Sequence, residues 1–559
     1  MTVPLLLIAW PSLTALTALI ANAIHRRLSL LIVALGHAGA VVLAGRALLI
    51  PSAAHAVVWL GPISLVPSPS ADSLTAVALV PAAVLLALLG WYSASYVGAA
   101  RHATFFLSLL LFLETGINLV LLAGDLLALY VGFLLLSLGL MFLIGLDFGS
   151  KGQEAALRLF ATLEVPSLVM LGVARLLGSR IGTAALTELE GRSTWMAVPS
   201  GAVLIAALGI VLLARTGLVP LHAWAVAGCR AAVAPAALAI TGIVLPLGAL
   251  VTGRVSDLIV PSGWVGSVLA VLAALTVVIA GIGALREETA FGWLAYLSIG
   301  ETGLVVFDLM TAAPADRVAM WISAGTAAAA LVAIGMHLGL VTRAAGHQQL
   351  DRLDWLGSRF GSAWTGSLAV LILLPLPPFA TFADRLALLT RLLRANGIVE
   401  HGAALLMILG TGLLAAALLR PAGRLNLLTR PEQTRRGQSD RCLPLYHGTR
   451  GAPAVLGLLL SLSVLVGSTQ MAWTTAIGRP LLFLSTGLVL GTVGLAGVLS
   501  PRGDWSFGKL GDRWAWGAAC RTIGRTLDLY ILIGGILLIG GRVSALTLEQ
   551  TLGRLARAR

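Results

Sequence analysis

The chain has 559 residues, of which 58% are hydrophobic and only 11% are charged, and its formal net charge is +13. Soluble domains carry about 25% charged residues, so this composition excludes a water-soluble protein. The basic residues lie mainly in short links between apolar stretches, which favours a role in membrane topology over nucleic-acid binding.

Apolar stretches follow one another along the chain, each about 18 to 25 residues long, which is the length of a helix that crosses a bilayer. The first, from Val3 to Ile24, has no small-residue cleavage site, so we expect it to remain as a span. Residues 54–70 mix apolar residues with Gly, Pro and Ser and predict an extracytoplasmic hairpin or interfacial loop. The predicted spans are 3–23, 28–50, 73–95, 103–123, 125–146, 157–177, 199–219, 233–252, 264–284, 289–310, 318–341, 364–395 with a break, 402–419, 453–475, 480–499 and 526–546.

The link with the most arginines is residues 420–452, and the positive-inside rule places it on the cytoplasmic side. Counting spans backwards from it puts the N-terminus outside and Arg26, Arg27 and Arg230 in the cytoplasm. Contact with an acidic partner or anionic lipid is an alternative role for this link. Residues 524–559 are either a span or an amphipathic segment lying along a complex, because arginine and leucine recur there at helical spacing.

The chain contains three cysteines, Cys229, Cys442 and Cys520, and no CxxC pair. This spacing indicates neither a disulfide framework nor a cysteine metal site. We therefore expect no cofactor, no metal site and no redox centre in the chain itself. If it takes part in an enzyme, we expect it to do so as one subunit of a translocase or oxidoreductase complex.

A few ionisable residues lie inside apolar spans, and each is a candidate for an ion path. A charge in the bilayer core costs several kcal/mol unless it faces a cavity or a partner. A structural salt bridge is the alternative explanation for any one of them. The residues are Glu114, Glu164, Arg215, His222, Glu301, Asp308, His337, Asp384 and Arg385.

Prolines stand near the middle of two predicted spans. Pro235 and Pro246 bracket an apolar run in the eighth span, and Pro377 and Pro378 precede Asp384 in the twelfth. A proline removes a backbone hydrogen bond from a helix, so both spans are predicted to be broken. Paired broken helices in two halves of a chain are typical of an ion or substrate path, and two ordinary proline kinks are the alternative.

Four segments resemble, in order and spacing, the motifs of one membrane-protein family. They are GDLLALYVGFLLLSLGLMFLIGLD (124–147), RTGLVPLHAW (215–224), FGWLAYLSIGETGLVVFDL (291–309) and PLPPFATFADR (375–385). Through these motifs, residues 70–400 resemble the antiporter-like subunits of respiratory complex I, Mrp antiporters, group 4 membrane-bound hydrogenases and formate hydrogenlyases.

The resemblance implies an all-α, polytopic membrane protein of about 14 to 16 transmembrane helices, with two inverted five-helix repeats that each contain a broken helix. The repeats would be residues 101–255 and 256–420. Residues 1–100 would hold the N-terminal helices and the hairpin, and 421–559 the arginine-rich loop and the C-terminal helices.

The resemblance also implies a multi-pass protein of the inner (cytoplasmic) membrane. Its partners would be other membrane subunits and the lipid bilayer, and not nucleic acid. A soluble redox partner and a bicarbonate-handling partner both remain open.

The chain departs from the family pattern where the family's proton relay would lie. Leu134 stands in place of a glutamate and Pro246 in place of a lysine, and Gly325 and Ala329 replace a histidine and a lysine. Much of the central relay is therefore absent.

Two further lysines of the family pattern are replaced by Arg215 and Arg385. Guanidinium stays charged in proteins, so these residues predict fixed countercharges or gates and not proton carriers. Glu114 and Glu164 could supply the carboxylate missing at position 134, and Glu301, Asp308 and Asp384 could form a rerouted path. Simple ion pairing with the arginines predicts the same residues.

Three functional hypotheses follow. The first is a membrane subunit of a complex I-related, hydrogenase-like or Mrp-like assembly that contributes to proton or sodium/proton translocation. The second is a non-pumping scaffold or coupling subunit of the same family, which the lost relay residues favour. The third is an unrelated solute transporter built on inverted repeats, which explains the broken helices but not the four motifs.

Overall fold

A computed structural model describes most of the chain up to Ala422. The described residues are 3–49, 57–60, 63–65, 73–98, 102–146, 149–191, 199–256, 264–311, 317–353, 363–374, 379–394, 398–422, 452–453, 455–456 and 459–460. All of them belong to one compact unit, Met1–Asp504. The predicted spans 480–499 and 526–546, and 453–475 beyond residue 460, lie outside the described residues.

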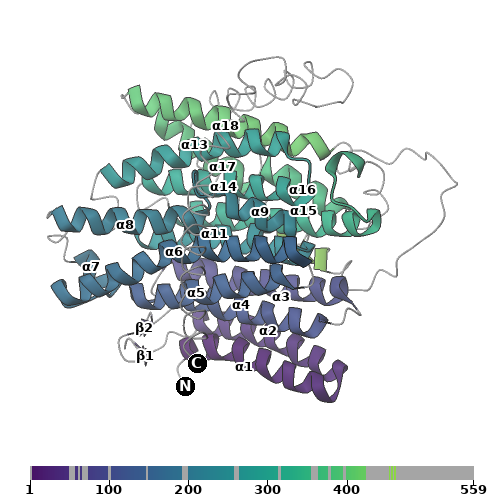
Figure 1. Cartoon of the computed structure of the whole chain (residues 1–559). Coiled ribbons are helices and arrows are strands. Elements are labelled where there is room, and N and C mark those ends of the chain that lie inside the picture. Colours follow the sequence, from purple (N-terminus) through teal and green to yellow (C-terminus); the bar gives the residue numbers. More distant parts are fainter. Residues whose placement is uncertain are drawn as a thin grey trace, which may run out of the picture. The chain divides into compact units, whose positions relative to one another are not determined.

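The described residues are almost entirely helical, which confirms the predicted all-α polytopic membrane fold (Figure 1). Eleven helices among them are long and apolar enough to cross a membrane. The helices are α1 (Val3–Ile24), α2 (Arg26–Leu49), α3 (Ser73–Val97), α4 (Ala103–Leu122), α5 (Leu126–Gly145), α6 (Gly149–Ile181), α7 (Leu186–Gly191), α8 (Pro199–Thr216), α9 (Ala223–Ala231), α10 (Ala234–Ala239), η2 (Ile240–Val244), α11 (Leu245–Arg254), α13 (Trp264–Arg286), α14 (Ala290–Thr311), α15 (Arg317–Ala345), η5 (Leu350–Arg352), α16 (Ala363–Leu373), α17 (Ala380–Arg394) and α18 (Ile398–Ala422).

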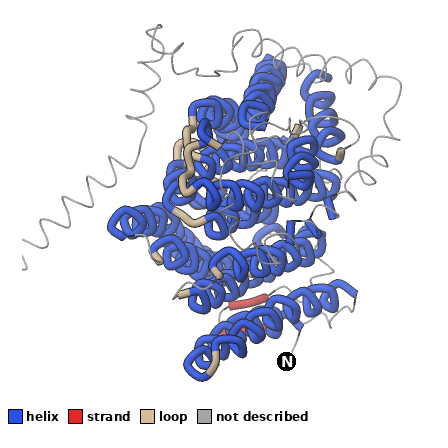
Figure 2. The backbone as a smooth tube through the Cα atoms, turned by 90° about the vertical axis from the view of Figure 1, so that its right-hand side faces the viewer, coloured by secondary structure: helices blue, strands red, loops and turns tan. Residues whose placement is uncertain are grey.

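A single hairpin interrupts the helical pattern between α2 and α3 (red in Figure 2). Its strands, β1 (Val57–Leu60) and β2 (Ile63–Leu65), pair antiparallel. The strands lie within residues 54–70, where the sequence predicts a hairpin or an interfacial loop.

The outer helices turn apolar side chains away from the protein. Leu16 of α1 and Leu35 of α2 are 56% and 55% exposed, as expected of side chains that face lipid. By contrast, α4 is buried over 89% of its most apolar stretch, against 33% for α1. The burial pattern therefore separates a lipid-facing pair of N-terminal helices from a central layer.

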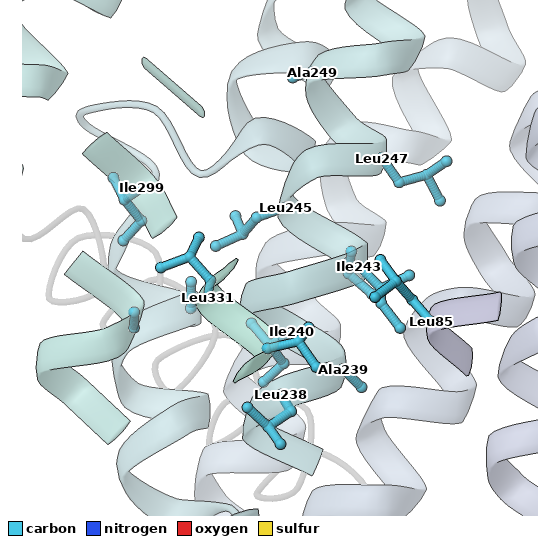
Figure 3. Packing of buried hydrophobic residues seen from close by; sticks show 14 of the residues in the cluster. Leu85, Leu238, Ala239, Ile240, Ile243, Leu245, Leu247, Ala249, Ile299 and Leu331 are labelled. Carbon is cyan, nitrogen blue, oxygen red and sulfur yellow. The ribbon is translucent and has the colours of Figure 1, made fainter. Parts of the chain in front are cut away.

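The stretch Ala234–Arg254 corrects one prediction. It is not unwound between Pro235 and Pro246: α10 continues through one π-helical turn, η2, into α11. Local π-helical adjustment re-satisfies backbone groups that a proline frees, so the span stays helical. Figure 3 shows aliphatic side chains of this stretch beside Ile299 and Leu331 in the buried core.

Two pairs of loops are joined by short backbone bridges. The loop before α5 pairs with the loop after α6, through the bridge between Asp125 and Ala185. The loop before α14 pairs with the segment after α15 in the same antiparallel manner, through Thr289 and Gln349. Each bridge gives hydrogen-bond partners to loop backbone groups that would otherwise have none between the ends of the helices.

Helices α8 and α11 approach each other closely at one glycine. A Cβ atom added at Gly248 would lie 2.4 Å from the carbonyl oxygen of Arg215, which is backbone and cannot rotate away. Only glycine therefore allows this contact, which positions the end of α8.

We predict that Gly248→Ala lowers the free energy of unfolding by about 1–3 kcal/mol, because it overpacks the contact between the two helices. The measurement is thermal or SDS-induced unfolding of the purified chain in detergent. Gly178→Ala is the matched control, because a Cβ at this exposed position of α6 meets nothing within 4 Å. Equal stability of the two variants would contradict the assignment of this contact.

Candidate functional site

The interruption of the helical path lies between α8 and α9 and not at the prolines of the next span. Gly217 has a φ of +64°, a left-handed conformation that ends α8 and favours glycine. The chain then runs without regular helix until α9 begins at Ala223. Trp224 fastens the start of α9 to the end of α8, because its Nε1 donates to the carbonyl oxygen of Ala214 at 2.9 Å.

Arg215 lies at the end of α8 with only 3% of its surface exposed. Its Nη2 lies 2.7 Å from Glu164 Oε1 on α6 and also donates to Ser167 of the same helix. Its Nη1 donates to Ser137 Oγ on α5 at 2.7 Å and to the carbonyl oxygen of Phe133 at 3.3 Å. The guanidinium also stacks on the Phe133 ring, 4.3 Å from the ring centroid.

This arrangement shows which of the predicted residues meet. Glu164, and not Glu114, is the carboxylate beside Arg215. Leu134, at the position of the family's glutamate, lies next to Phe133 on α5 and is half-buried. The charge of Arg215 is thus balanced by a carboxylate from α6, and a hydroxyl from α5 accepts a hydrogen bond from the same guanidinium.

Two atoms of the pair remain unsatisfied. Neither Arg215 Nε nor Glu164 Oε2 has a hydrogen-bond partner among the described residues, and both are buried. An ionised carboxylate has acceptor sites on both oxygens, so Oε2 is a position where water or a proton can bind.

A second, partly buried pair lies between the end of α16 and the first turns of α17. The guanidinium of Arg385 bonds Glu301 of α14 through Nη2, and its Nη1 donates to the carbonyl oxygen of Leu373 at 2.8 Å. Thr381 donates to the neighbouring carbonyl of Ile372. Side chains from the first turns of α17 therefore cap the end of α16, whose last carbonyls have no partner within the helix.

The prolines predicted to break this span, Pro377 and Pro378, lie outside the described residues. The two helices on either side are described and end at Leu373 and begin at Ala380. The span predicted as 364–395 with a break is therefore two helices.

The remaining predicted acids of the second half cluster beside this pair. Arg391 of α17 forms an ion pair with Asp308 of α14. Asp384 accepts a hydrogen bond from Ser323 of α15 and interacts with Asp308 and both arginines. Three carboxylates thus share two guanidinium groups, and this excess of one acid makes the cluster a candidate to hold a proton.

Glu114 does not join either cluster. Its Oε2 lies 2.8 Å from Nδ1 of His37 on α2. His37 could not be predicted as a partner, because an isolated histidine in an apolar span carries no pattern.

His222 precedes α9 in the unwound segment, and its ring centroid lies 6.3 Å from that of Tyr296 on α14. His337 is fully buried in α15.

One further ionic contact has no signal in the sequence. Glu287, after α13, accepts hydrogen bonds from Arg230 of α9, from Nε at 3.1 Å and from Nη2. Arg420 of α18 donates to the carbonyl oxygens of Leu285 and Glu287. Arg420 is the first residue of the arginine-rich link that the sequence places in the cytoplasm; it is buried and fastens α18 to the end of α13.

Comparison with known proteins identifies the family. The family model described as NADH:quinone oxidoreductase/Mrp antiporter, TM, matches residues 123–411, more than half of the chain. The NADH-quinone oxidoreductase subunit N of Heliobacterium modesticaldum is 29% identical over 53% of the chain and 63% of its own length. A Na(+)/H(+) antiporter protein of Bacillus subtilis is 27% identical over 46% of the chain and 52% of its own length.

A structural comparison agrees with this fold. A chain in the Mrp complex from a Dietzia species superposes with a TM-score of 0.75 and 20% identity, over 98% of this chain and 63% of that one. The matched regions thus span less than two thirds of these relatives and of this neighbour.

We predict that Glu164→Ala lowers the free energy of unfolding by about 3–5 kcal/mol, because it leaves a buried guanidinium without its carboxylate. Replacing both Arg215 and Glu164 with Met should restore most of this loss, since no charge then remains buried. The measurement is the free energy of SDS-induced unfolding in mixed micelles, for the native chain, for Glu164→Ala and for the double variant.

The matched control is Glu154→Ala on the same helix. The ion pair of Glu154 with Arg158 is exposed, so its loss should cost about 0–1 kcal/mol. A double variant as unstable as Glu164→Ala alone would show that the pair does not account for the loss.

Proposed function

The chain belongs to the NADH:quinone oxidoreductase/Mrp antiporter membrane family, and we propose that it is a subunit of a larger inner-membrane assembly that moves protons, or exchanges sodium for protons. The observation that carries this proposal is that an Arg–Glu contact lies at each of two helix interruptions: the buried pair of Arg215 with Glu164 and the partly buried pair of Arg385 with Glu301. Buried charges of this kind, beside unwound backbone, are characteristic of ion paths through membranes.

In this proposal the carboxylates carry the proton. Each arginine keeps its carboxylate ionised and, by moving away from it, allows it to accept a proton. Guanidinium does not release a proton, so Arg215 stabilises the ionised form of Glu164 as long as the two groups touch. Ser137 Oγ and the Phe133 carbonyl already bind the other side of the same guanidinium. A small shift of Arg215 towards α5 would weaken its contact with Glu164 and let this carboxylate accept a proton.

The proposed path in the second half also pairs each arginine with a carboxylate, and it has one additional carboxylate that can accept a proton. Arg385 neutralises Glu301, Arg391 neutralises Asp308, and Asp384 is the extra carboxylate. A proton released near Glu301 therefore has an acceptor in the same cluster.

We propose the division of the described helices into two five-helix repeats, 101–255 and 256–420. The two loop bridges support it, because each joins the loop before the second helix of a repeat to the loop after the third. The interrupted helix is the fourth in both, as α8 with α9 and as α16 with α17. Residues 1–100 and 421–559 then flank this pair of repeats.

A non-pumping scaffold or coupling subunit of the same family is the second candidate. The observation that favours it is the loss of relay residues at Leu134, Pro246, Gly325 and Ala329. A Cβ at Gly325 would meet nothing within 4 Å, so the structure leaves room there but no titratable group. The family match leaves an unrelated solute transporter without support.

Energy for transport would come from partner chains. We propose other membrane subunits as direct partners, and a soluble redox or bicarbonate-handling protein on the cytoplasmic side as the energy-supplying one. Purification of the complex from its native membrane tests this proposal, because the proteins that copurify show whether the soluble partner is a redox protein or a bicarbonate-handling protein.

We predict that Glu164→Gln and Glu301→Gln each lower proton movement by about tenfold or more, since an increase of about 1.4 kcal/mol in the barrier gives that factor. The measurement is the rate of internal pH change in liposomes that contain the chain with its native partners. Glutamine keeps the shape of the side chain but cannot exchange a proton.

Glu154→Gln is the control on the same helix as Glu164, because its carboxylate is exposed. Undiminished transport in both buried variants, with the complex intact, would favour the scaffold hypothesis.

A further inference from the structure

His37 and Glu114 form a buried ionisable pair outside the region that the family model matches. The matched region begins at residue 123, whereas this pair joins α2 to α4. The relative exposure of His37 is 4% and that of Glu114 is 0%, and Nδ1 and Oε2 lie 2.8 Å apart. The contact is therefore a hydrogen bond shielded from solvent and separate from both arginine pairs.

The pair lies near the middle of its helices. His37 stands eleven residues after Arg26, the first residue of α2, and Glu114 eleven residues after Ala103, the first of α4. At about 1.5 Å per residue, each is about 16 Å from the start of its helix. That depth is about half of a hydrocarbon core about 30 Å thick.

The surrounding helices offer no other charge at this depth. Of the elements packed on α2 and α4, α1, α3 and α5 contain no Asp, Glu, Lys, Arg or His, and their phenols are Tyr92, Tyr96 and Tyr130. The fourth, α11, has one charged residue, Arg254, which donates to the carbonyl oxygens of Val120 and Leu121 near the end of α4. Glu114 is the only charged residue of α4, and the other charged residues of α2 are Arg26 and Arg27 at its start and Arg46 near its end. The net charge at this depth is therefore set by the protonation of His37 and Glu114 alone.

Two atoms of the pair have no partner. His37 Nε2 and Glu114 Oε1 are buried and make no hydrogen bond among the described residues. The imidazole edge lies against α3 at Gly90, where an added Cβ would be 2.6 Å from Nε2. A pair that served only to fasten α2 to α4 would leave two unsatisfied groups, and a buried polar atom without a partner loses its hydrogen bond to water and gains none in the protein.

Two more unpartnered hydroxyls lie on the same helices, nearer their starts. Ser29 Oγ of α2 and Ser108 Oγ of α4 are buried and make no hydrogen bond among the described residues. They stand three and five residues after the first residues of their helices. Both therefore lie between the pair and the membrane face marked by Arg26, and both can bind water.

We propose that His37 and Glu114 form a proton-binding site at the middle of the bilayer, reached from the Arg26 side past Ser29 and Ser108. In the empty state a neutral imidazole donates Nδ1–H to an ionised carboxylate, and the net charge is −1. One proton binds at Nε2 or Oε1 and forms one N–H or O–H bond. The net charge becomes zero. With the added proton at Nε2, the proton of the central hydrogen bond is on either Nδ1 or Oε2; with the added proton at Oε1, it stays on Nδ1.

The test is infrared difference spectroscopy of the full chain in liposomes, between acid and alkaline pH, in H₂O and in D₂O. We expect a pH-dependent carboxyl band that is lost in Glu114→Gln and shifted in His37→Gln, and an imidazole band that is lost in His37→Gln and shifted in Glu114→Gln. The carboxyl band should shift promptly in D₂O, because the proposed path admits water. In Ser29→Ala with Ser108→Ala the band should remain but exchange more slowly.

Asn118→Leu is the matched control on α4. Asn118 fastens this helix to α1 through a hydrogen bond to the Leu7 carbonyl but does not titrate, so its loss should leave the bands unchanged. If Glu114→Gln does not fold, the double variant His37→Gln with Glu114→Gln keeps a neutral hydrogen-bonded pair and should lack both bands.

Native spectra without a band that these variants remove, or a band that exchanges no faster than the protein core, would overturn the proposal. The outcome is independent of the proposed transport function. Glu164→Gln and Glu301→Gln should leave these bands in place, whatever they do to proton movement.

Discussion

The cost of placing a guanidinium inside a bilayer governs the arrangement of this protein. Arg215 and Arg385 cannot lose their charge, so each needs a carboxylate and additional acceptors within reach. Glu164 and Glu301 supply the carboxylates, and hydroxyl or backbone oxygens supply the rest. Three helices must therefore meet at each arginine, and the helix that carries or faces the arginine must end there.

The helix ends at the two interruptions are stable because side chains bind their carbonyl groups or a glycine ends the helix. Gly217 ends α8 in a left-handed conformation, and Gly248 lets α11 approach the same turn. At the other interruption, Thr381 and Arg385 bind the last carbonyls of α16. The same residues thus neutralise charge, cap a helix and hold a carboxylate, which links stability to any change in protonation.

The fold class, most span positions, the hairpin and the family were all predictable, because hydrophobic length and motif order are local features of the chain. The position of the first break was predicted wrongly. Pro235 and Pro246 drew attention to the eighth span, but a π-helical turn keeps that span helical. The unwound segment begins at Gly217, where glycine conformation and packing on α11 matter more than proline content. His37 had no local signal at all.

Residue type and spacing alone establish that this chain crosses a membrane many times, that few ionisable groups enter its spans, and that arginines occupy positions where relatives carry lysines. The pairing of these groups is settled only by the folded arrangement, in which Glu164 faces Arg215 and Glu301 faces Arg385, whereas Glu114 faces His37. Each of these partners lies more than 50 residues away in the chain, and helix packing, which depends on all the surrounding side chains together, brings them into contact.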